Sequence, residues 1–145
     1  MKIIKELENM QSEMQEWRRD IHAHPEIAFE EHRTAQIVAD KLESFGIEVE
    51  TGIAGTGVVG TLRKGMGNRS IGLRADLDAL LINETNDFDH KSKTPGQMHA
   101  CGHDGHTTML LGAAKYLSEH GNFDGTVNFI FQPAEENEGG GRAMI

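Results

Sequence analysis

A thiol and an imidazole stand two residues apart in the middle of the chain, within MHACGHDGH at residues 98–106. Gly102 separates Cys101 from His103, and its lack of a Cβ lets the two side chains turn toward one point. A helix is expected to begin directly afterwards, and its positive end favours a thiolate. Both side chains suit zinc and neighbouring divalent metals. Taken alone, this short pattern more often marks a buried cysteine beside a histidine that hydrogen-bonds at a helix end.

Two adjacent carboxylates, Glu135 and Glu136, follow an apolar segment that ends at Pro133. Neighbouring residues in an extended chain point to opposite sides, so one acid can bind a metal while the other handles protons. Two carboxylates that only faced each other would be costly. Taken alone, the pair fits a solvated acidic loop better, since Glu138 is nearby.

A second pair of acids, Asp76 and Asp78, closes a segment that is predicted to be a buried strand. The carboxyl ends of strands are the usual ligand-binding edge of open α/β sheets. These acids could therefore support metal ligands by hydrogen bonding. The alternative is a strand-end turn in which Asp76 pairs with Arg74.

Two further histidines, His22 and His24, precede Pro25 and could also be ligands. His22 is better explained as a donor to the free carbonyls at a helix C-terminus. Surface positions are expected for three others: His32, His90 and His120.

These residues need a scaffold, and the hydrophobic pattern predicts one in which helices and strands alternate. Helices are expected at residues 3–23, 31–45, from 104 or 107 to 118, and from 142. Strands are expected at residues 47–51, 57–62, 70–76 and 126–132, with a long loop at 83–97. Alternation of this kind is typical of a layered α/β domain, although the order of the strands cannot be read from it.

The composition limits the classes of protein and partner. The chain has 145 residues with 37% apolar and 26% charged side chains, as expected of a globular domain with a core. A net charge of −9 argues against a nucleic-acid partner. The single cysteine cannot form an internal disulfide, and neither a signal peptide nor a membrane-spanning apolar run is recognisable. We therefore expect a cytoplasmic protein without a membrane partner.

Five motifs, taken in order, resemble the M20 metallopeptidase family, and specifically its amidohydrolase branch, which includes hippurate hydrolases, deacetylases of N-acetyl amino acids and auxin-conjugate hydrolases. The motifs are RRDIHAHPE at 18–26, GTG at 55–57, RADLDAL at 74–80, MHACGHDGHT at 98–107 and FQPAEE at 131–136. The resemblance implies an α/β fold in three layers, a sheet with helices on both faces, belonging to a zinc-exopeptidase-like catalytic domain.

The resemblance also implies roles for single residues. Cys101, His103 and Glu136 match metal ligands, and Glu135 matches the general base. We expect Asp76, Asp104 and His106 to support these ligands by hydrogen bonding. Relatives usually hold two divalent ions, zinc, manganese, cobalt or nickel, which activate a water for hydrolysis of an N-acyl amino acid.

The sequence departs from the family pattern in several ways. Leu81 stands where the family usually has proline, and Asn137 where glycine often follows the glutamate pair. Residues 142–145 resemble the first turn of a helix at which the sequence stops. Residues 1–145 are therefore expected to be the N-terminal portion of the catalytic domain, without its remainder and without the family's dimerisation domain.

Three candidate ligands cannot close a two-metal site, so we expect this chain alone to be nearly inactive. The competing hypotheses are a non-catalytic metal-binding or interaction module and a peptidase of the same superfamily. The Cys-Gly-His segment argues against the peptidase. A small-molecule substrate and a homo-oligomer complete the expected partners.

Overall fold

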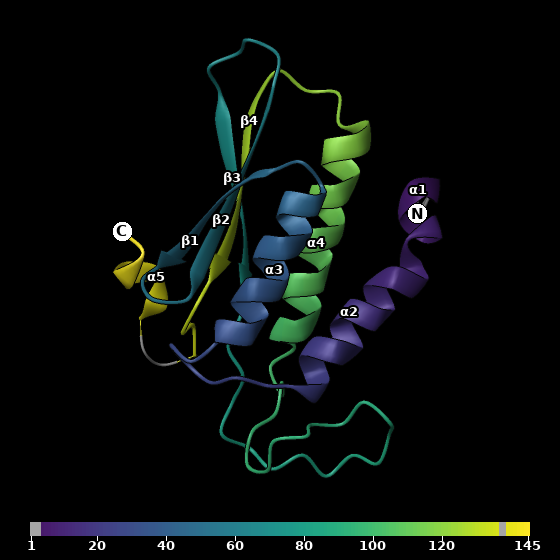
Figure 1. Ribbon diagram of the computed structural model, residues 1–145, viewed down its shortest axis with the longest axis vertical. Coiled ribbons are helices and arrows are strands. Elements are labelled where there is room, and N and C mark those ends of the chain that lie inside the picture. Colours follow the sequence, from purple (N-terminus) through teal and green to yellow (C-terminus); the bar gives the residue numbers. More distant parts are fainter. Residues whose placement is uncertain (1–3, 137–138) are drawn as a thin grey trace.

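A computed structural model describes residues 4–136 and 139–145 as a four-stranded sheet with helices packed against it (Figure 1). The sheet has the order β1-β2-β4-β3. In chain order the elements are α1 (Lys5–Asn9), α2 (Gln11–Ala23), α3 (His32–Ser44), β1 (Glu48–Ile53), β2 (Gly57–Lys64), β3 (Ser70–Asp76), α4 (His103–His120), β4 (Gly125–Gln132) and α5 (Gly140–Ala143).

The last of the described strands, β4, occupies an inner position between β2 and β3. It pairs antiparallel with β2 and parallel with β3, and Asp76 lies opposite Gln132 in the parallel register. The carboxyl ends of β3 and β4 consequently lie side by side. The residues that follow each strand therefore meet at one edge of the sheet, where ligands bind in open α/β folds.

Buried and half-buried side chains alternate along β4, and the buried ones form part of the core. Val127, Phe129 and Phe131 are buried against the helices, and the residues between them are only half-buried. The helices α3 and α4 lie on this face, whereas α2 packs against α4 (Figure 1). Leu111 and Ala114 from α4 and Leu42 from α3 are fully buried in the same cluster. This packing sets the N-terminus of α4 close to the end of β3.

The opposite face of the sheet carries the short helix α5 (Figure 1). A Cβ built on Gly57 would lie 3.1 Å from the methyl of Met144, whereas the neighbouring Val58 points into the core. The α/β class and helices on both faces are therefore confirmed. Within the part of the chain that the structure describes, α5 is the one helix on the second face.

Most element boundaries agree with the sequence prediction, with three differences. The first predicted helix is divided at Met10, whose N–H bonds to the carbonyl of Leu7, one residue short of the α-helical spacing. Helix α4 begins earlier than expected, at His103, because Gly102 serves as its N-cap with φ 89°. Helix α5 likewise begins two residues early, and residues 1–3 lie outside the described part.

Among the described residues, none of the helices combines the length and apolar character needed to span a bilayer.

Candidate metal centre

Three side chains that the sequence analysis selected as ligands converge at the edge of the sheet. One donor atom each from Cys101, His103 and Glu136 lies within 4.8 Å of the other two. Cys101 stands in the turn before α4, His103 is the first residue of α4, and Glu136 follows β4. The inner position of β4 brings these two segments together, and Gly102 provides the left-handed turn that joins the thiol to the helix.

The imidazole of His103 is held in one orientation by Asp78. Nδ1 of His103 lies 2.8 Å from the backbone oxygen of Asp78 and 3.2 Å from its Oδ1, so Nδ1 carries the hydrogen. The other nitrogen, Nε2, then faces three carboxylates. They are Glu135 and Glu136, each at 3.7 Å, and Asp76 at 3.9 Å.

Asp78 anchors a second ligand as well, because its Oδ2 accepts a hydrogen bond of 3.0 Å from the backbone N–H of Glu136. The carboxylate is almost completely buried. Burial alone would raise its pKa, but the hydrogen bonds from His103 and from the backbone of Glu136 and Glu135 outweigh burial and lower the pKa. Asp78 therefore stays ionised while it fixes both ligands, as partners of metal-bound histidines do.

The electrostatics of the centre fit a cation. Oε1 of Glu136 is buried and accepts no hydrogen bond from the described residues. Cys101 is exposed, yet the pKa of its thiol is raised by its hydrogen bond to Glu136, by partial desolvation and by the charges of Glu136, Glu135 and Asp76. Burial alone would lower the pKa of His103, but its hydrogen bonds to Asp78 and the charges of Asp78 and Asp76 outweigh burial and raise this pKa from 6.5 to about 8. A divalent ion among these atoms would neutralise the clustered negative charge and favour the thiolate.

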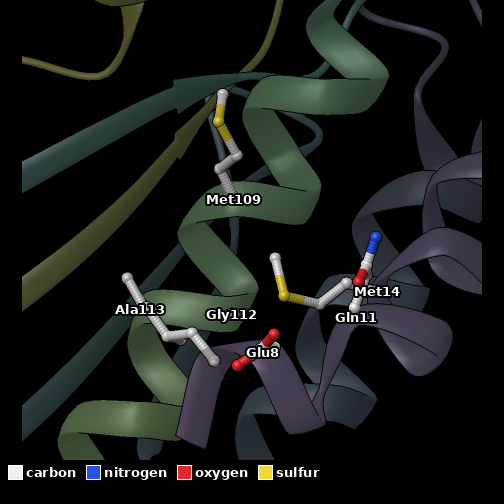
Figure 2. A pocket seen from close by; sticks show the side chains of 7 residues that line it. Glu8, Gln11, Met14, Met109, Gly112 and Ala113 are labelled. Atoms are coloured by element: carbon white, nitrogen blue, oxygen red, sulfur yellow. The ribbon is translucent and has the colours of Figure 1, made fainter. Parts of the chain in front are cut away.

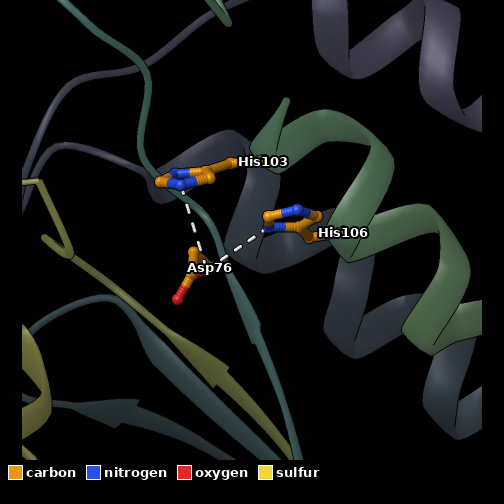
Figure 3. Close-up of side chains that lie close together, drawn as sticks. All are labelled: Asp76, His103 and His106. Atoms are coloured by element: carbon orange, nitrogen blue, oxygen red, sulfur yellow. Dashed lines mark hydrogen bonds and ion pairs between the residues drawn. The ribbon is translucent and has the colours of Figure 1, made fainter. Parts of the chain in front are cut away.

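Asp76 and His106 form a second group around the same imidazole (Figure 3). Oδ2 of Asp76 lies 3.4 Å from Nδ1 of His106 and 3.9 Å from Nε2 of His103. Donor atoms of these three residues also lie within 4.8 Å of one another. Oδ1 of Asp76 pairs with Arg74 at 2.6 Å, so the strand-end pair considered in the sequence analysis exists beside the contact with the centre.

Asp104 is completely buried, but its carboxylate contacts helix α2 rather than the candidate ligands. Its Oδ2 lies 2.8 Å from Nδ1 of His22 and 3.2 Å from Nε of Arg18. Its link to the centre runs through the backbone of α4, since it follows His103 directly. Asp104 therefore anchors the start of α4 to α2.

The two histidines before Pro25 belong to neither group of possible metal ligands found in the described residues. His22 is buried between two carboxylates, with Nε2 3.1 Å from Glu84. His24 bonds instead to the backbone oxygen of Asp20, as a residue at a helix end does. His32 and His120 are exposed as predicted, whereas His90 is half-buried and stacks on Phe88.

The contacts of Glu84 were missed, because an isolated acid within a loop forms no pattern that a sequence could reveal. Another unexpected residue is His99, which is buried and whose two ring nitrogens have no hydrogen-bond partner among the described residues. Burial lowers its pKa to about 4, so this imidazole is neutral near pH 7.

An apolar cavity of about 440 Å³ adjoins the centre, and Asp78 and Glu136 form part of its wall. The rest of the wall is largely apolar and includes Ile27, Phe29, Leu80, Leu81 and Ile82. A larger cavity of about 500 Å³ lies away from the centre, among α1, α2 and α4, where Met14 and Met109 line it (Figure 2).

Known proteins resemble both the sequence and the fold. The model of peptidase family M20/M25/M40 matches residues 72–145. The chain is 53% identical to a hippurate hydrolase of Campylobacter jejuni over 145 residues, all of this chain and 38% of that protein. It is 48% identical to an N-acyl-L-amino acid amidohydrolase of Geobacillus stearothermophilus over 131 residues, 89% of this chain and 35% of that protein.

One of the solved structures has the same fold as this chain. It is a dinuclear metal-binding peptidase of the M20 family from Bacillus subtilis, with a TM-score of 0.89 and 39% identity, over 94% of this chain and 39% of that one. The chain thus spans well under half the length of these relatives. The family match runs from the acids of β3 through the Cys-Gly-His turn to the glutamate pair, and the chain belongs to peptidase family M20/M25/M40.

Proposed function

We propose that this chain supplies metal ligands and the general base of an amidohydrolase that cleaves N-acyl amino acids. The observation that carries the proposal is the convergence of Cys101, His103 and Glu136 within 4.8 Å. Sulfur, nitrogen and carboxylate oxygen around one point are a donor set typical of zinc and similar ions. The family supports divalent metals, since one relative is a dinuclear metal-binding peptidase.

In this proposal Cys101, His103 and Glu136 hold metal, and two divalent ions complete the site. When bound, the ions supply an acidified water and polarise the amide oxygen. Glu135 has the freedom for proton transfer, because its side chain is 38% exposed while its Oε2 remains 3.7 Å from Nε2 of His103. It accepts the proton of the attacking water and returns it to the leaving amine.

The cavity beside Glu136 supports an apolar substrate group. Its wall of Ile27, Phe29 and Leu80–Ile82 presents apolar side chains and suits an apolar acyl group or side chain, while the metal ligand stands at its edge. The names of the relatives point the same way: one is a hippurate hydrolase and another an N-acyl-L-amino acid amidohydrolase.

Three ligands do not complete a two-metal site, so we expect the chain alone to bind metal weakly and to hydrolyse hippurate or N-acetyl amino acids hardly at all. The second candidate function, a metal-binding module without turnover, is favoured by the same ligand count. Translating the gene beyond Ile145 separates the two, because an enzyme needs further histidine ligands there.

The test begins with cobalt, whose bond to a thiolate gives a near-ultraviolet charge-transfer band. Titration of the chain with Co²⁺ should produce this band, and Cys101→Ala should abolish it. Equal cobalt content in the two proteins would remove Cys101 from the site.

A longer chain from the same gene then tests turnover. It should hydrolyse hippurate or N-acetyl amino acids, and Glu135→Gln should lower kcat by about 10²-fold or more, as loss of a general base does. Full turnover in the Gln variant would exclude Glu135 as the base.

A further inference from the structure

Glu31 is a completely buried acid that lies outside the candidate metal centre. Its Oε2 accepts a hydrogen bond of 2.5 Å from the hydroxyl of Thr56, and its Oε1 accepts one of 2.9 Å from the backbone N–H of Ala134. Among the described residues no basic side chain forms an ion pair with it. Burying a carboxylate without a counter-ion is unfavourable, so packing alone does not explain an acid at this position.

The second of these bonds falls on a strained position. Ala134 has φ 51°, a left-handed conformation that residues with a Cβ seldom adopt. Such conformations persist where surrounding contacts enforce them. Here the enforcing contacts are the bond from the Ala134 N–H to Glu31 and a bond of 3.0 Å from the Gly140 N–H to the Ala134 carbonyl.

The strained residue directly precedes the two glutamates of the proposed site. Two buried carboxylates therefore hold the backbone on either side of Glu135: Glu31 accepts from the N–H of Ala134, and Asp78 accepts from the N–H of Glu136. The direction in which both glutamate side chains leave the end of β4 depends on this pair of bonds. Asp78 also bonds to His103, whereas Glu31 forms no hydrogen bond or ion pair with Cys101, His103 or Glu136, so its effect passes through the backbone.

We propose that Glu31 is a positioning residue, which sets the metal affinity of the centre by holding Ala134 in the turn that presents Glu135 and Glu136. This inference rests on the proposed function, since it assigns Glu136 to the metal.

Three variants of the described chain test it. Glu31→Met removes both hydrogen bonds and keeps the volume. Glu31→Gln keeps an oxygen for the N–H of Ala134 and an amide that can donate to Thr56. Thr56→Val is the matched control, because it disturbs the same buried carboxylate but leaves its bond to Ala134.

In a cobalt titration, Glu31→Met should raise the apparent Kd by about tenfold or more, which is the usual effect of losing a group that orients a ligand. Glu31→Gln and Thr56→Val should stay within about threefold of the native Kd, even where Thr56→Val lowers Tm. A native Kd in Glu31→Met overturns the proposal, and so does an equal loss in Thr56→Val, which would trace the effect to stability.

Amide hydrogen exchange tests the role of Glu31 in the turn without any metal present. Exchange at Ala134 and Glu136 should accelerate at least about tenfold in Glu31→Met and remain native in Thr56→Val; unchanged exchange in Glu31→Met overturns the proposal. A native chain that fails to bind cobalt removes the proposed function, yet the exchange result still decides whether Glu31 holds the turn. Should Glu31→Met not fold, Glu31→Asp replaces it, because it withdraws the carboxylate by one methylene.

Discussion

Asp78 is the residue on which the geometry of the candidate centre depends most. It contacts the imidazole of His103 and the backbone of Glu136, and these two residues come from segments more than thirty positions apart. From the sequence, Asp78 is recognisable only as an acid at the end of a predicted strand, beside Asp76. Which of the two acids would face the histidine depends on the direction of each side chain after the strand ends, and periodicity does not specify that direction.

The first prediction concerns this contact. Asp78→Ala should weaken cobalt or zinc binding by about ten- to a hundredfold, because His103 loses the carboxylate that orients it and the backbone N–H of Glu136 loses its acceptor. Isothermal titration calorimetry measures the affinity.

Asp124→Ala is the control for Asp78→Ala. Asp124 also accepts two backbone hydrogen bonds, from Met66 and Gly67, but at the opposite end of the sheet. Both variants should lose stability: Asp78→Ala by about 1–3 kcal/mol, because its acceptor is buried, and Asp124→Ala by about 0.5–1.5 kcal/mol, because its hydrogen bonds are exposed to solvent. Only Asp78→Ala should lose metal affinity, and a similar loss in Asp124→Ala would show that affinity merely follows stability.

At the level of the elements, the long loop at residues 83–97 is fixed by Glu84. Its carboxylate bonds to the backbone N–H of Ser92 within the loop and to His22 on α2. His22 bonds in turn to Asp104 at the start of α4. The loop, α2 and α4 thus share one buried polar cluster next to the candidate ligands.

The second prediction uses the pH dependence of this cluster. Burial raises the pKa of Glu84, but hydrogen bonds from Ser92, Asn86 and His22 outweigh it and lower the pKa from 4.5 to about 2. Because the folded pKa is the lower one, the stabilisation is complete above about pH 4.5 and is lost as the pH falls toward 2. Glu84→Gln should therefore be less stable than the native chain at pH 7, and the two should converge in acid.

The free energy of unfolding of both chains is measured at several pH values by urea unfolding, followed by the fluorescence of Trp17, the single tryptophan. Asp87→Asn is the control, since Asp87 lies in the same loop with an exposed side chain whose one ion pair within the described part of the chain is with Lys91. A constant difference between Glu84→Gln and the native chain from pH 7 to 3 would contradict the role given to Glu84.

The elements also show how far the sequence could predict the structure. Strands and helices were predictable because each carries its own hydrophobic period, and Cys101, His103 and the glutamate pair were predictable because each motif lies within a few residues. The roles of Glu31 and Glu84 were not, because each depends on a partner in a distant segment. His22 was expected to cap its own helix, whereas the fold turns it toward two acids.

For the whole molecule, the order of strands was the part that the sequence left open. The strand order β1-β2-β4-β3 depends on which apolar faces pack together over long distances, and local patterns do not encode it. The fold class was nevertheless predictable, because alternating helices and strands have few ways to form layers. Similarly, the three-layer expectation holds, although α5 alone represents the third layer among the described residues.

The inner place of β4 has a consequence for how the chain acquires its structure. Since β4 follows β2 and β3 in the chain and must pair with both, the four described strands cannot form their sheet before residue 132 is available. Pairings between distant segments form slowly, because the entropy of closing the intervening chain must be overcome first. Glu136 can join Cys101 and His103 only after that step.

In a stopped-flow refolding experiment with Co²⁺ present, the thiolate band should thus never appear before Trp17 has reached its native fluorescence. A cobalt signal that preceded the tryptophan signal would mean that the ligands assemble without the completed sheet.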